Sequence, residues 1–169
     1  MIFRNAESKD KEQILKIYSD AREYMKKSGN TEQWGDNYPP ESLIISDIDE
    51  KISYVCDIDG EVAAVFMFVP NEDKDYKNID GAWLNQEKCG TIHRIAVSST
   101  MHGKGICARC FDFCAMMCRE KGIYNLKIDT HKDNIPMQKT LARYGFKYCG
   151  TVVLFDELIR MGYQYVIGE

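Results

Sequence analysis

The sequence predicts a mixed α+β domain, with antiparallel strands toward both ends of the chain and βα units in the middle. Two observations predict this class. Short alternating apolar runs, separated by turn residues, mark strands near both ends. Between them, the β-branched run at residues 91–97 leads through a turn with two glycines into a segment of helical periodicity. The expected order is β-α-α-β-β-β-α-β-α-β-β, with about seven strands and about four helices.

A strand and an amphipathic helix are expected first. Residues 2–6 alternate, and Ser8 is expected to cap a helix that runs to about Lys27. An irregular stretch with two aromatic residues, Trp34 and Tyr38, follows. The apolar positions of the helix recur at steps of three and four, which predicts one face against a core: Ile14, Ile17, Tyr18, Ala21 and Met25.

A second helix and a hairpin are expected next. Pro40 is expected to open the helix, because its fixed backbone angle suits a first turn. Strands at residues 52–58 and 61–69 are joined at Asp59-Gly60, a dipeptide that favours tight hairpins. Residues 71–88 are polar, irregular and longer than an ordinary connection, so we expect a functional or mobile segment there.

The second half is expected to alternate helices and strands. A helix over residues 104–121 is expected to stop at Gly122. Asn134 is expected to cap the next helix, with Pro136 tolerated in its first turn and Gly145 at its end. The remaining strands are predicted at residues 126–130, 146–155 and 163–167.

Composition is that of an ordinary globular protein, and we expect one domain over residues 1–169. The net charge of −4 gives no broad basic face, which argues against nucleic acid as a partner. The chain has no apolar run long enough to span a bilayer and no signal core at its N-terminus, so we expect neither membrane attachment nor export. With seven cysteines, this favours a reducing cytoplasm and reduced thiols.

Four of the cysteines have a spacing that superficially resembles an iron–sulfur motif: Cys107, Cys110, Cys114 and Cys118. They lie in the segment of helical periodicity, so the first and the last would be roughly 16 Å apart at about 1.5 Å per residue. Sulfurs spread so widely cannot meet at one zinc ion, since each must lie about 2.3 Å from it. We therefore expect small buried side chains and no metal.

The turn that follows the central strand predicts an anion site. A glycine-rich turn at a helix N-terminus directs backbone N–H groups outward, where the helix dipole places roughly half a positive charge. Gly103 and Gly105 carry no side chain that would keep a phosphate from that backbone. The pattern is neither a P-loop nor a dinucleotide fingerprint, because Ser98 and Ala108 stand where those motifs need glycine. A turn that needs glycine only for its backbone angles is the alternative.

Three segments, in this order, resemble the GNAT superfamily of N-acetyltransferases. IAVSSTMHGKGICA is similar to the family's strand and pyrophosphate loop, DTHKDNIPMQ to the segment whose Asn contacts coenzyme A, and LARYGF to its closing helix. With the order of elements, the resemblance covers essentially the whole chain. It implies a GNAT-like fold, with a mostly antiparallel sheet that contains one splayed parallel pair. It also implies acetyl-CoA as the donor of an acetyl group to a primary amine.

The resemblance implies which residues hold acetyl-CoA. Ile95 and Val97 match strand positions whose backbone pairs with pantetheine, and Asn134 matches the Asn of the fourth helix. Lys104 and Arg109 are either phosphate contacts or solvated charges. The loop and first helical turn that cradle the pyrophosphate match seven residues: His102, Gly103, Lys104, Gly105, Ile106, Cys107 and Ala108. Two of these, His102 and Cys107, depart from the family's usual residues, but backbone N–H groups supply most of such a cradle.

Acetyl transfer needs a base that takes a proton from the amine and an N–H that stabilises the oxyanion. The resemblance gives the backbone of Val97 as the N–H donor. His93, on the same strand, is the leading base because imidazole titrates near neutral pH, and a packed strand histidine is the alternative. Asp129 and His131 are second choices. Arg94 is expected to face solvent by the alternation of the strand.

Leu141 stands where many members of the family carry a tyrosine that protonates the leaving thiolate. The general acid is therefore unassigned, and water can serve, because a thiol with a pKa near 8.5 is a tolerable leaving group. Trp34 and Tyr38 are expected either to line the acceptor pocket or to pack in the core. We expect a small-molecule cationic amine as acceptor, with residues 71–88 as a lid, and leave a homodimer open.

Two other functions stay open. A catalytically degenerate module that binds CoA or acts as a sensor is favoured by the missing tyrosine and the altered loop residues. An unrelated phosphate-binding α+β protein would require the match of the three segments to be accidental. Release of CoA that an amine stimulates would identify the enzyme.

Overall fold

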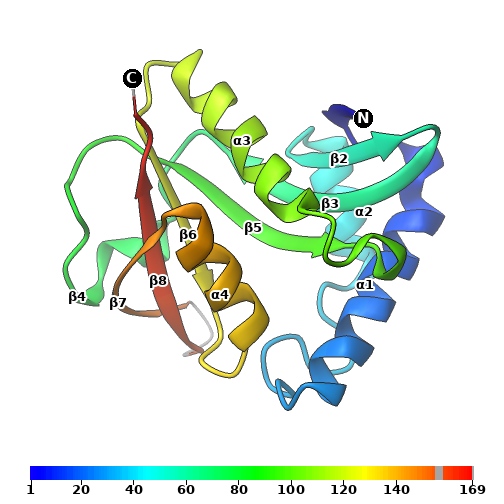
Figure 1. Ribbon diagram of the computed structural model, residues 1–169, viewed down its shortest axis with the longest axis horizontal. Coiled ribbons are helices and arrows are strands. Elements are labelled where there is room, and N and C mark those ends of the chain that lie inside the picture. The colour runs from blue at the N-terminus through cyan, green and yellow to red at the C-terminus, as the bar shows by residue number, and fades with distance from the viewer. Residues whose placement is uncertain (155–157, 169) are drawn as a thin grey trace. The chain divides into compact units, whose positions relative to one another are not determined.

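The computed structural model describes residues 1–154 and 158–168, and Figure 1 traces their course. The α-helices in these residues are α1 (Lys11–Lys27), α2 (Glu41–Asp49), α3 (Ile106–Arg119) and α4 (Ile135–Tyr144). Short 3-10 helices are η1 (Ser8–Asp10), η2 (Lys74–Lys77) and η3 (Ser99–Met101). The strands are β1 (Ile2–Asn5), β2 (Ser53–Ile58), β3 (Glu61–Val69), β4 (Ile79–Gly81), β5 (Gly90–Val97), β6 (Asn125–Thr130), β7 (Lys147–Val153) and β8 (Ile159–Val166).

The strands form an eight-stranded sheet in the order β1-β2-β3-β5-β6-β8-β7-β4. Five neighbouring pairs are antiparallel: β1–β2, β2–β3, β6–β8, β7–β8 and β4–β7. Strands β5 and β6 are parallel, and their register runs from Gly90 opposite Leu126 to Ile92 opposite Ile128. Beyond these positions β5 runs on to Val97 and β6 to Thr130. The predicted mixed α+β class and the mostly antiparallel sheet are confirmed, with one strand more than expected.

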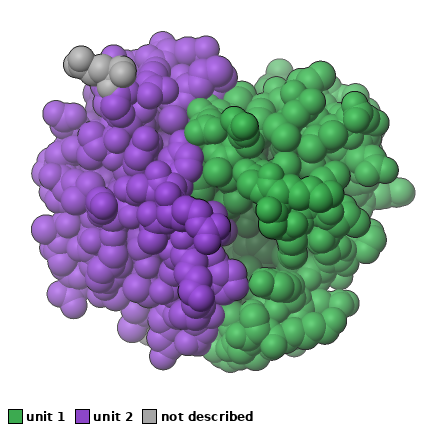
Figure 2. All heavy atoms as spheres, in the orientation of Figure 1, with its two compact units in different colours: residues 1–68, 93–113 green, residues 69–92, 114–169 purple. Residues whose placement is uncertain are grey.

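The chain divides into two compact units, which Figure 2 colours separately. Unit 1 comprises residues 1–68 and 93–113, and unit 2 comprises residues 69–92 and 114–169. Strand β5 and helix α3 contribute residues to both. The expectation of one domain stays a prediction.

Unit 1 has a core built on the apolar face of α1. The predicted residues Ile14, Ile17 and Tyr18 are buried there, and Ala21 and Met25 pack against them. Ala6 and Trp34 also belong to this cluster, and helix α2 and strands β2, β3 and β5 supply its six further members: Ile44, Ile48, Val55, Val62, Val65 and Ala96. The 3.6-residue periodicity of α1 therefore identified its buried face correctly.

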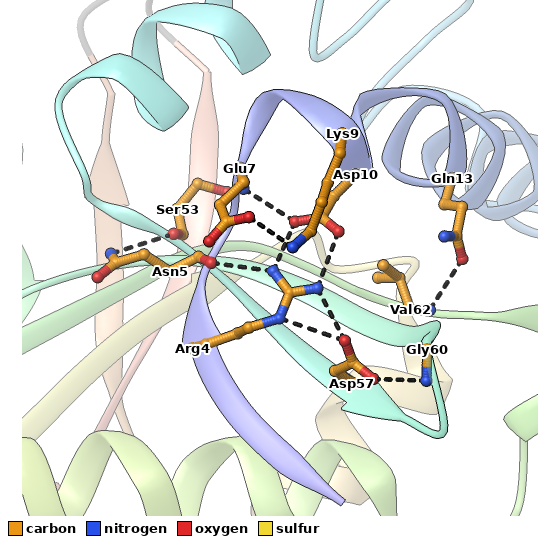
Figure 3. Close-up of polar contacts among 10 residues, drawn as sticks. All are labelled: Arg4, Asn5, Glu7, Lys9, Asp10, Gln13, Ser53, Asp57, Gly60 and Val62. Carbon is orange, nitrogen blue, oxygen red and sulfur yellow. Dashed lines mark hydrogen bonds and ion pairs between the residues drawn. The ribbon is translucent and has the colours of Figure 1, made fainter.

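A polar cluster lies near the N-terminus of unit 1, where the expected helix cap is wrong. Ser8 does not cap α1; it lies in η1, and the Asp10 carboxylate accepts a hydrogen bond from the Glu7 N–H at 2.8 Å. Arg4 of β1 donates to Asp10 at 2.6 and 2.9 Å and to Asp57 of β2 at 2.8 and 3.2 Å (Figure 3). One guanidinium thus ties β1, η1 and β2 together, since its planar fork serves two carboxylates at once.

Unit 2 contains the segment 71–88, which is more structured than the sequence suggested. It holds η2 and the edge strand β4, and it packs on a core of Tyr76, Trp83, Cys149 and Val152. Tyr76 is fully buried, and its carbonyl accepts a hydrogen bond from the Trp83 indole at 2.9 Å. The expectation that residues 71–88 are irregular is therefore wrong in part. Buried aromatic residues hold this segment against the sheet, and they follow no regular spacing in the sequence that would predict their burial.

Strand β4 depends on two glycines at its junction with β7. Gly81 lies opposite Gly150, with φ angles of +138° and +144°. A Cβ atom at Gly81 would lie 2.2 Å from the Cys149 carbonyl oxygen, and one at Gly150 would lie 2.3 Å from that of Asp80. Only glycine allows the two backbones to approach this closely.

The C-terminal elements match the prediction in type and differ at their ends. Asn134 caps α4 through a hydrogen bond that its Oδ1 accepts from the Met137 N–H at 3.2 Å. Gly145 ends the helix in a left-handed conformation, so both predicted caps are confirmed. Helix α3 begins at Ile106 rather than at residue 104, and β8 begins at Ile159 rather than at residue 163. The predicted end of strand 146–155, at residue 155, lies outside the described residues.

Candidate functional site

The turn between β5 and α3 leaves open space over its backbone. Gly103 and Gly105 have φ angles of +76° and +75°, a left-handed conformation that glycine adopts without strain. A Cβ atom at either position would meet nothing within 4 Å. The N-terminus of α3 follows directly at Ile106. The turn therefore combines the positive end of a 14-residue helix with an uncovered backbone, as an anion site requires.

The polar side chains in the turn and at the start of α3 each have a contact. The His102 Nε2 atom lies 3.2 Å from the Val97 carbonyl oxygen, and the ring packs edge-on against Tyr24 of α1 at 5.2 Å. The Lys104 Nζ atom lies 3.6 Å from the Met101 sulfur. Arg109 forms an exposed ion pair with Asp112 at 3.7 Å. His102 thus connects the turn to the end of β5, the strand on which the proposed catalytic groups lie.

Cys107 and its helical neighbours are packing residues. Burial raises the pKa of the Cys107 thiol to about 12, so the thiol stays protonated at neutral pH. Cys110, Cys114 and Cys118 are buried along α3, as the helical spacing predicted. All seven cysteines are thiols rather than disulfides. In the described residues, no three or more His, Cys, Asp or Glu side chains gather where they could hold a metal ion.

Strand β5 carries three further candidate residues of unit 1. His93 and Val97 are half-buried, and Ile95 is buried. His93 lies within electrostatic range of Asp47 on α2. Burial raises the pKa of the Asp47 carboxyl, and the charges of Arg94 and His93 oppose that shift.

Arg94 does not face solvent, so that expectation is wrong. Its side chain is 12% exposed and its Nη2 donates to the Asp47 Oδ2 at 2.6 Å, while Asp47 is itself 9% exposed. The cause lies in the backbone: Arg94 has a φ of +50°, which lies outside the extended region, so the regular alternation of the strand does not hold at this residue. Period-2 reasoning assumes a regular strand and so misplaces this side chain.

The two aromatic candidates for the acceptor pocket differ in position. Trp34 is 8% exposed and belongs to the core of unit 1, where its ring packs edge-on against Tyr18 at 5.6 Å. Tyr38 is 40% exposed, and its hydroxyl accepts a hydrogen bond from the Arg94 Nη1 at 3.4 Å. Of the two alternatives for Trp34, core packing is the one that the contacts favour, whereas Tyr38 presents a surface aromatic ring.

The candidates in unit 2 make contacts within that unit. Asn134 uses its side chain to cap α4. The Asp129 carboxylate accepts a hydrogen bond from the buried Tyr76 hydroxyl at 2.6 Å and lies 3.9 Å from the Arg160 Nε. The His131 Nδ1 accepts a hydrogen bond from the Asp133 N–H at 3.3 Å. Both second choices for the base are thus engaged in structural contacts. Leu141 is fully buried on α4.

Sequence reasoning missed one residue of interest. Thr130, the last residue of β6, is fully buried, and its Oγ1 atom has no hydrogen-bond partner in the described part of the chain. Buried hydroxyls are normally paired, so an orphaned one at a strand end marks a position that a ligand or water would satisfy. Nothing in the sequence distinguishes Thr130 from a core threonine such as Thr91, which is equally buried.

No helix in residues 1–154 and 158–168 has the length and apolar character that crossing a bilayer requires. A family model described as the acetyltransferase (GNAT) family matches residues 12–146. No curated protein matches the chain.

Solved structures extend this similarity over the chain. A GNAT-family acetyltransferase from Streptococcus agalactiae 2603 shares 29% identity, with 99% of this chain and 96% of that chain covered and a TM-score of 0.84. A putative acetyltransferase from Staphylococcus aureus Mu50 shares 22% identity, with 99% of this chain and 100% of that chain covered and a TM-score of 0.74. The putative acetyltransferase yncA from Salmonella typhimurium, solved with its cofactor acetyl-CoA, shares 16% identity, with 99% of this chain and 94% of that chain covered and a TM-score of 0.68. The last two show likeness of fold alone.

Proposed function

The chain belongs to the GNAT family of acetyltransferases, and from this premise we propose that it is an N-acetyltransferase that moves an acetyl group directly from acetyl-CoA to a primary amine. The observation that carries the proposal is the turn at Gly103 and Gly105, where an uncovered backbone meets the N-terminus of α3. A pyrophosphate is the natural occupant, because N–H groups and a helix dipole both favour negative charge there.

Acetyl-CoA is proposed to bind along β5 and the turn. The pyrophosphate would lie on the backbone of residues 102–108, and pantetheine would pair with the backbone of Ile95 and Val97. Asn134, which caps α4, is a further proposed CoA contact. His102 would lie beside the phosphates, where a ring N–H can donate a hydrogen bond.

The proposed chemistry uses two groups of β5. The amine nitrogen attacks the thioester carbonyl carbon, and its proton passes to His93, directly or through a water. The backbone N–H of Val97 stabilises the oxyanion that forms. The C–S bond then breaks, and the CoA thiolate takes a proton from solvent, since Leu141 offers no acidic hydrogen.

The acceptor is proposed to be a small cationic amine. The net charge of −4 mildly attracts cations and disfavours nucleic acid, and the face of the exposed Tyr38 ring suits a cation. The lid expected from residues 71–88 is not part of this proposal, because Tyr76 and Trp83 anchor that segment in unit 2. Seven thiols support a cytoplasmic setting, where thiols stay reduced.

A module that binds CoA without catalysis is the second candidate, and Leu141 favours it. This residue is fully buried on α4, so the position carries packing rather than acid chemistry. Such a module would bind acetyl-CoA and release no CoA when an amine is added.

Calorimetry with acetyl-CoA, followed by CoA release over a panel of small amines and basic peptides, tests the proposal. We expect binding by the wild type, a loss of roughly tenfold or more in Gly105→Asp because like charges repel, and CoA release that small amines stimulate. Gly122→Asp is the matched control, since Gly122 has a φ of +67° with open space around it at the other end of α3. Equal affinity in folded Gly105→Asp would refute the site. Turnover on peptide lysines alone would refute the acceptor.

A further inference from the structure

Arg94 adopts an unusual backbone conformation at the centre of β5. Its φ of +50° lies in the left-handed region, which residues with bulky side chains rarely enter because the Cβ crowds the backbone. It follows His93 and precedes Ile95, so it lies between the proposed base and the proposed pantetheine-binding strand. A strained residue of this kind persists only where its surroundings hold it.

Three side chains from the first part of the chain hold Arg94 in place. Tyr18 of α1, which is 3% exposed, donates its hydroxyl hydrogen to the Arg94 carbonyl at 2.9 Å. Asp47 of α2 accepts from the guanidinium Nη2 at 2.6 Å and from Nε at 3.1 Å. Tyr38, in the segment that joins these two helices, accepts from Nη1 at 3.4 Å. Backbone and side chain of Arg94 are therefore both restrained, from α1, α2 and their connection.

These contacts have consequences for the residues on either side of Arg94. A residue outside the extended region changes the direction of the strand, so the direction of the Ile95–Val97 backbone depends on the conformation at residue 94. The same conformation affects the position of the backbone at His93, the residue directly before Arg94. Asp47, which binds Arg94, also lies within electrostatic range of His93.

We propose that Arg94 is a positioning residue for acetyl transfer. Held by Tyr18, Asp47 and Tyr38, it fixes the left-handed backbone conformation at residue 94, and this conformation aligns the Ile95–Val97 backbone for pantetheine and places His93. The inference rests on the proposed function, because it assumes that acetyl-CoA binds along β5. Arg94 itself contacts neither the thioester nor the amine. It acts through the backbone that it holds.

A second arginine–aspartate cluster in unit 1 provides the comparison. Arg4 also binds buried and half-buried carboxylates, at Asp10 and Asp57, and it also joins strands to a helical element (Figure 3). It lies on β1 rather than on β5. Loss of Arg4 therefore measures what a structural ion pair contributes, and loss of Arg94 measures that contribution together with any alignment of β5.

The experiment compares two ligands in four proteins. Wild type, Arg94→Met, Tyr18→Phe and Arg4→Met are titrated by calorimetry with acetyl-CoA and with ADP, which has a pyrophosphate and no pantetheine. We expect Arg94→Met and Tyr18→Phe to lose roughly tenfold in affinity for acetyl-CoA and to keep their affinity for ADP. Arg4→Met should keep both. Thermal unfolding of each variant measures the change in stability separately.

The outcomes separate this inference from the proposed function. If the wild type binds acetyl-CoA and both Arg94→Met and Tyr18→Phe bind it equally well, the positioning role is wrong and the site stands. If the variants lose affinity for ADP as much as for acetyl-CoA, Arg94 has only a structural role. If the wild type binds neither ligand, the site and the inference fall together. Should Arg94→Met not fold, Tyr18→Phe decides, because it removes a single oxygen atom.

Discussion

Two buried threonines in unit 2 differ in a single respect. Thr91 and Thr130 are both fully buried on strands, but the Thr91 hydroxyl donates to the Asn71 carbonyl at 2.6 Å and the Thr130 hydroxyl has no partner in the described residues. An unpaired buried hydroxyl contributes no hydrogen bond to offset its lost hydration. Valine has nearly the same shape and no such requirement.

We therefore expect Thr130→Val to leave the free energy of unfolding unchanged or to raise it by about 1 kcal/mol, and Thr91→Val to lower it by about 1 kcal/mol. Urea denaturation of the two variants measures both changes. A larger loss in Thr130→Val than in Thr91→Val would show that the hydroxyl of Thr130 has a partner after all. A loss of CoA release without a loss of stability would place that partner on the ligand.

His93→Ala tests the proposed base. Because the imidazole takes the proton of the amine, its removal should lower amine-dependent CoA release by roughly a hundredfold or more. The affinity for acetyl-CoA should stay near the wild-type value, since the backbone of β5 and the turn supply the binding contacts. Steady-state rates and calorimetry on one preparation give the two numbers, and a wild-type rate would remove His93 from the mechanism.

Residues whose roles are local were predicted well, and residues whose roles depend on distant partners were not. Asn134 and Gly145 were identified as caps because a cap contacts its own helix within a few residues. Arg94 was misplaced because its positive φ interrupts the strand alternation, and the partners that hold it there, Tyr18 and Asp47, lie far away in the sequence. Thr130 gave no signal, since the absence of a partner is a property of the folded chain.

At the scale of elements, β4 depends on the close contact of Gly81 and Gly150. A Cβ atom at Gly150 would lie 2.3 Å from the Asp80 carbonyl oxygen, so Gly150→Ala should separate β4 from β7. We expect faster hydrogen exchange at residues 79–82 and a loss of stability about 2 kcal/mol greater than in Gly60→Ala. Gly60 is the matched control, because it has a φ of +88° with nothing within 4 Å. Equal losses in both variants would mean that only backbone strain matters at Gly150.

The Arg4 cluster should make stability depend on pH. The hydrogen bonds from Arg4 hold the pKa values of Asp10 and Asp57 below their usual range. A carboxyl with a lowered folded pKa stabilises the fold above its unfolded pKa, which is about 3.9, and loses that contribution as the pH falls through the folded value.

Arg4→Met should therefore be less stable than wild type at pH 7, and the difference should shrink as the pH falls below about 4. Urea denaturation at pH 7 and at pH 3 measures it. Lys16→Met is the control, because the Lys16–Asp20 pair is exposed on α1 and surface pairs contribute little. A difference that stays constant between the two pH values would exclude the ion pairs as its cause.

Most helices and strands were predictable from the sequence, and the elements that were missed have physical reasons. Helix α1 and the β2–β3 hairpin follow from periodicity and a turn dipeptide, which are properties of adjacent residues. Strand β4 was missed because it is three residues long and requires a glycine on another strand. The cap expected at Ser8 was wrong because the short 3-10 helix η1 precedes α1 and contains Ser8. Asp10, the last residue of η1, forms an ion pair with Arg4.

At the scale of the whole molecule, the thiols report on packing. Six of the seven cysteines are buried and Cys107 is partly exposed, with a pKa raised to about 12 by burial. The native protein should therefore react slowly with a thiol reagent, at one site at most, while all seven thiols react in denaturant. The absorbance of the thiolate that the reagent releases measures the number of protein thiols that have reacted. Cys107→Ser should abolish the native reaction, and rapid labelling of several thiols would indicate a loosened core.

The division of unit 1 into residues 1–68 and 93–113 has a consequence for biosynthesis. A nascent chain that has emerged as far as residue 68 lacks the part of β5 whose end binds β3, where the Ser98 N–H donates to the Ala63 carbonyl at 2.9 Å. At about 5–20 residues per second, the ribosome needs roughly 2–9 s to extend the chain from residue 69 to residue 113. During those seconds β3 is an open edge with an apolar face, a template for pairing with other chains. Slow translation of this stretch would lengthen the time for which the edge of β3 is exposed.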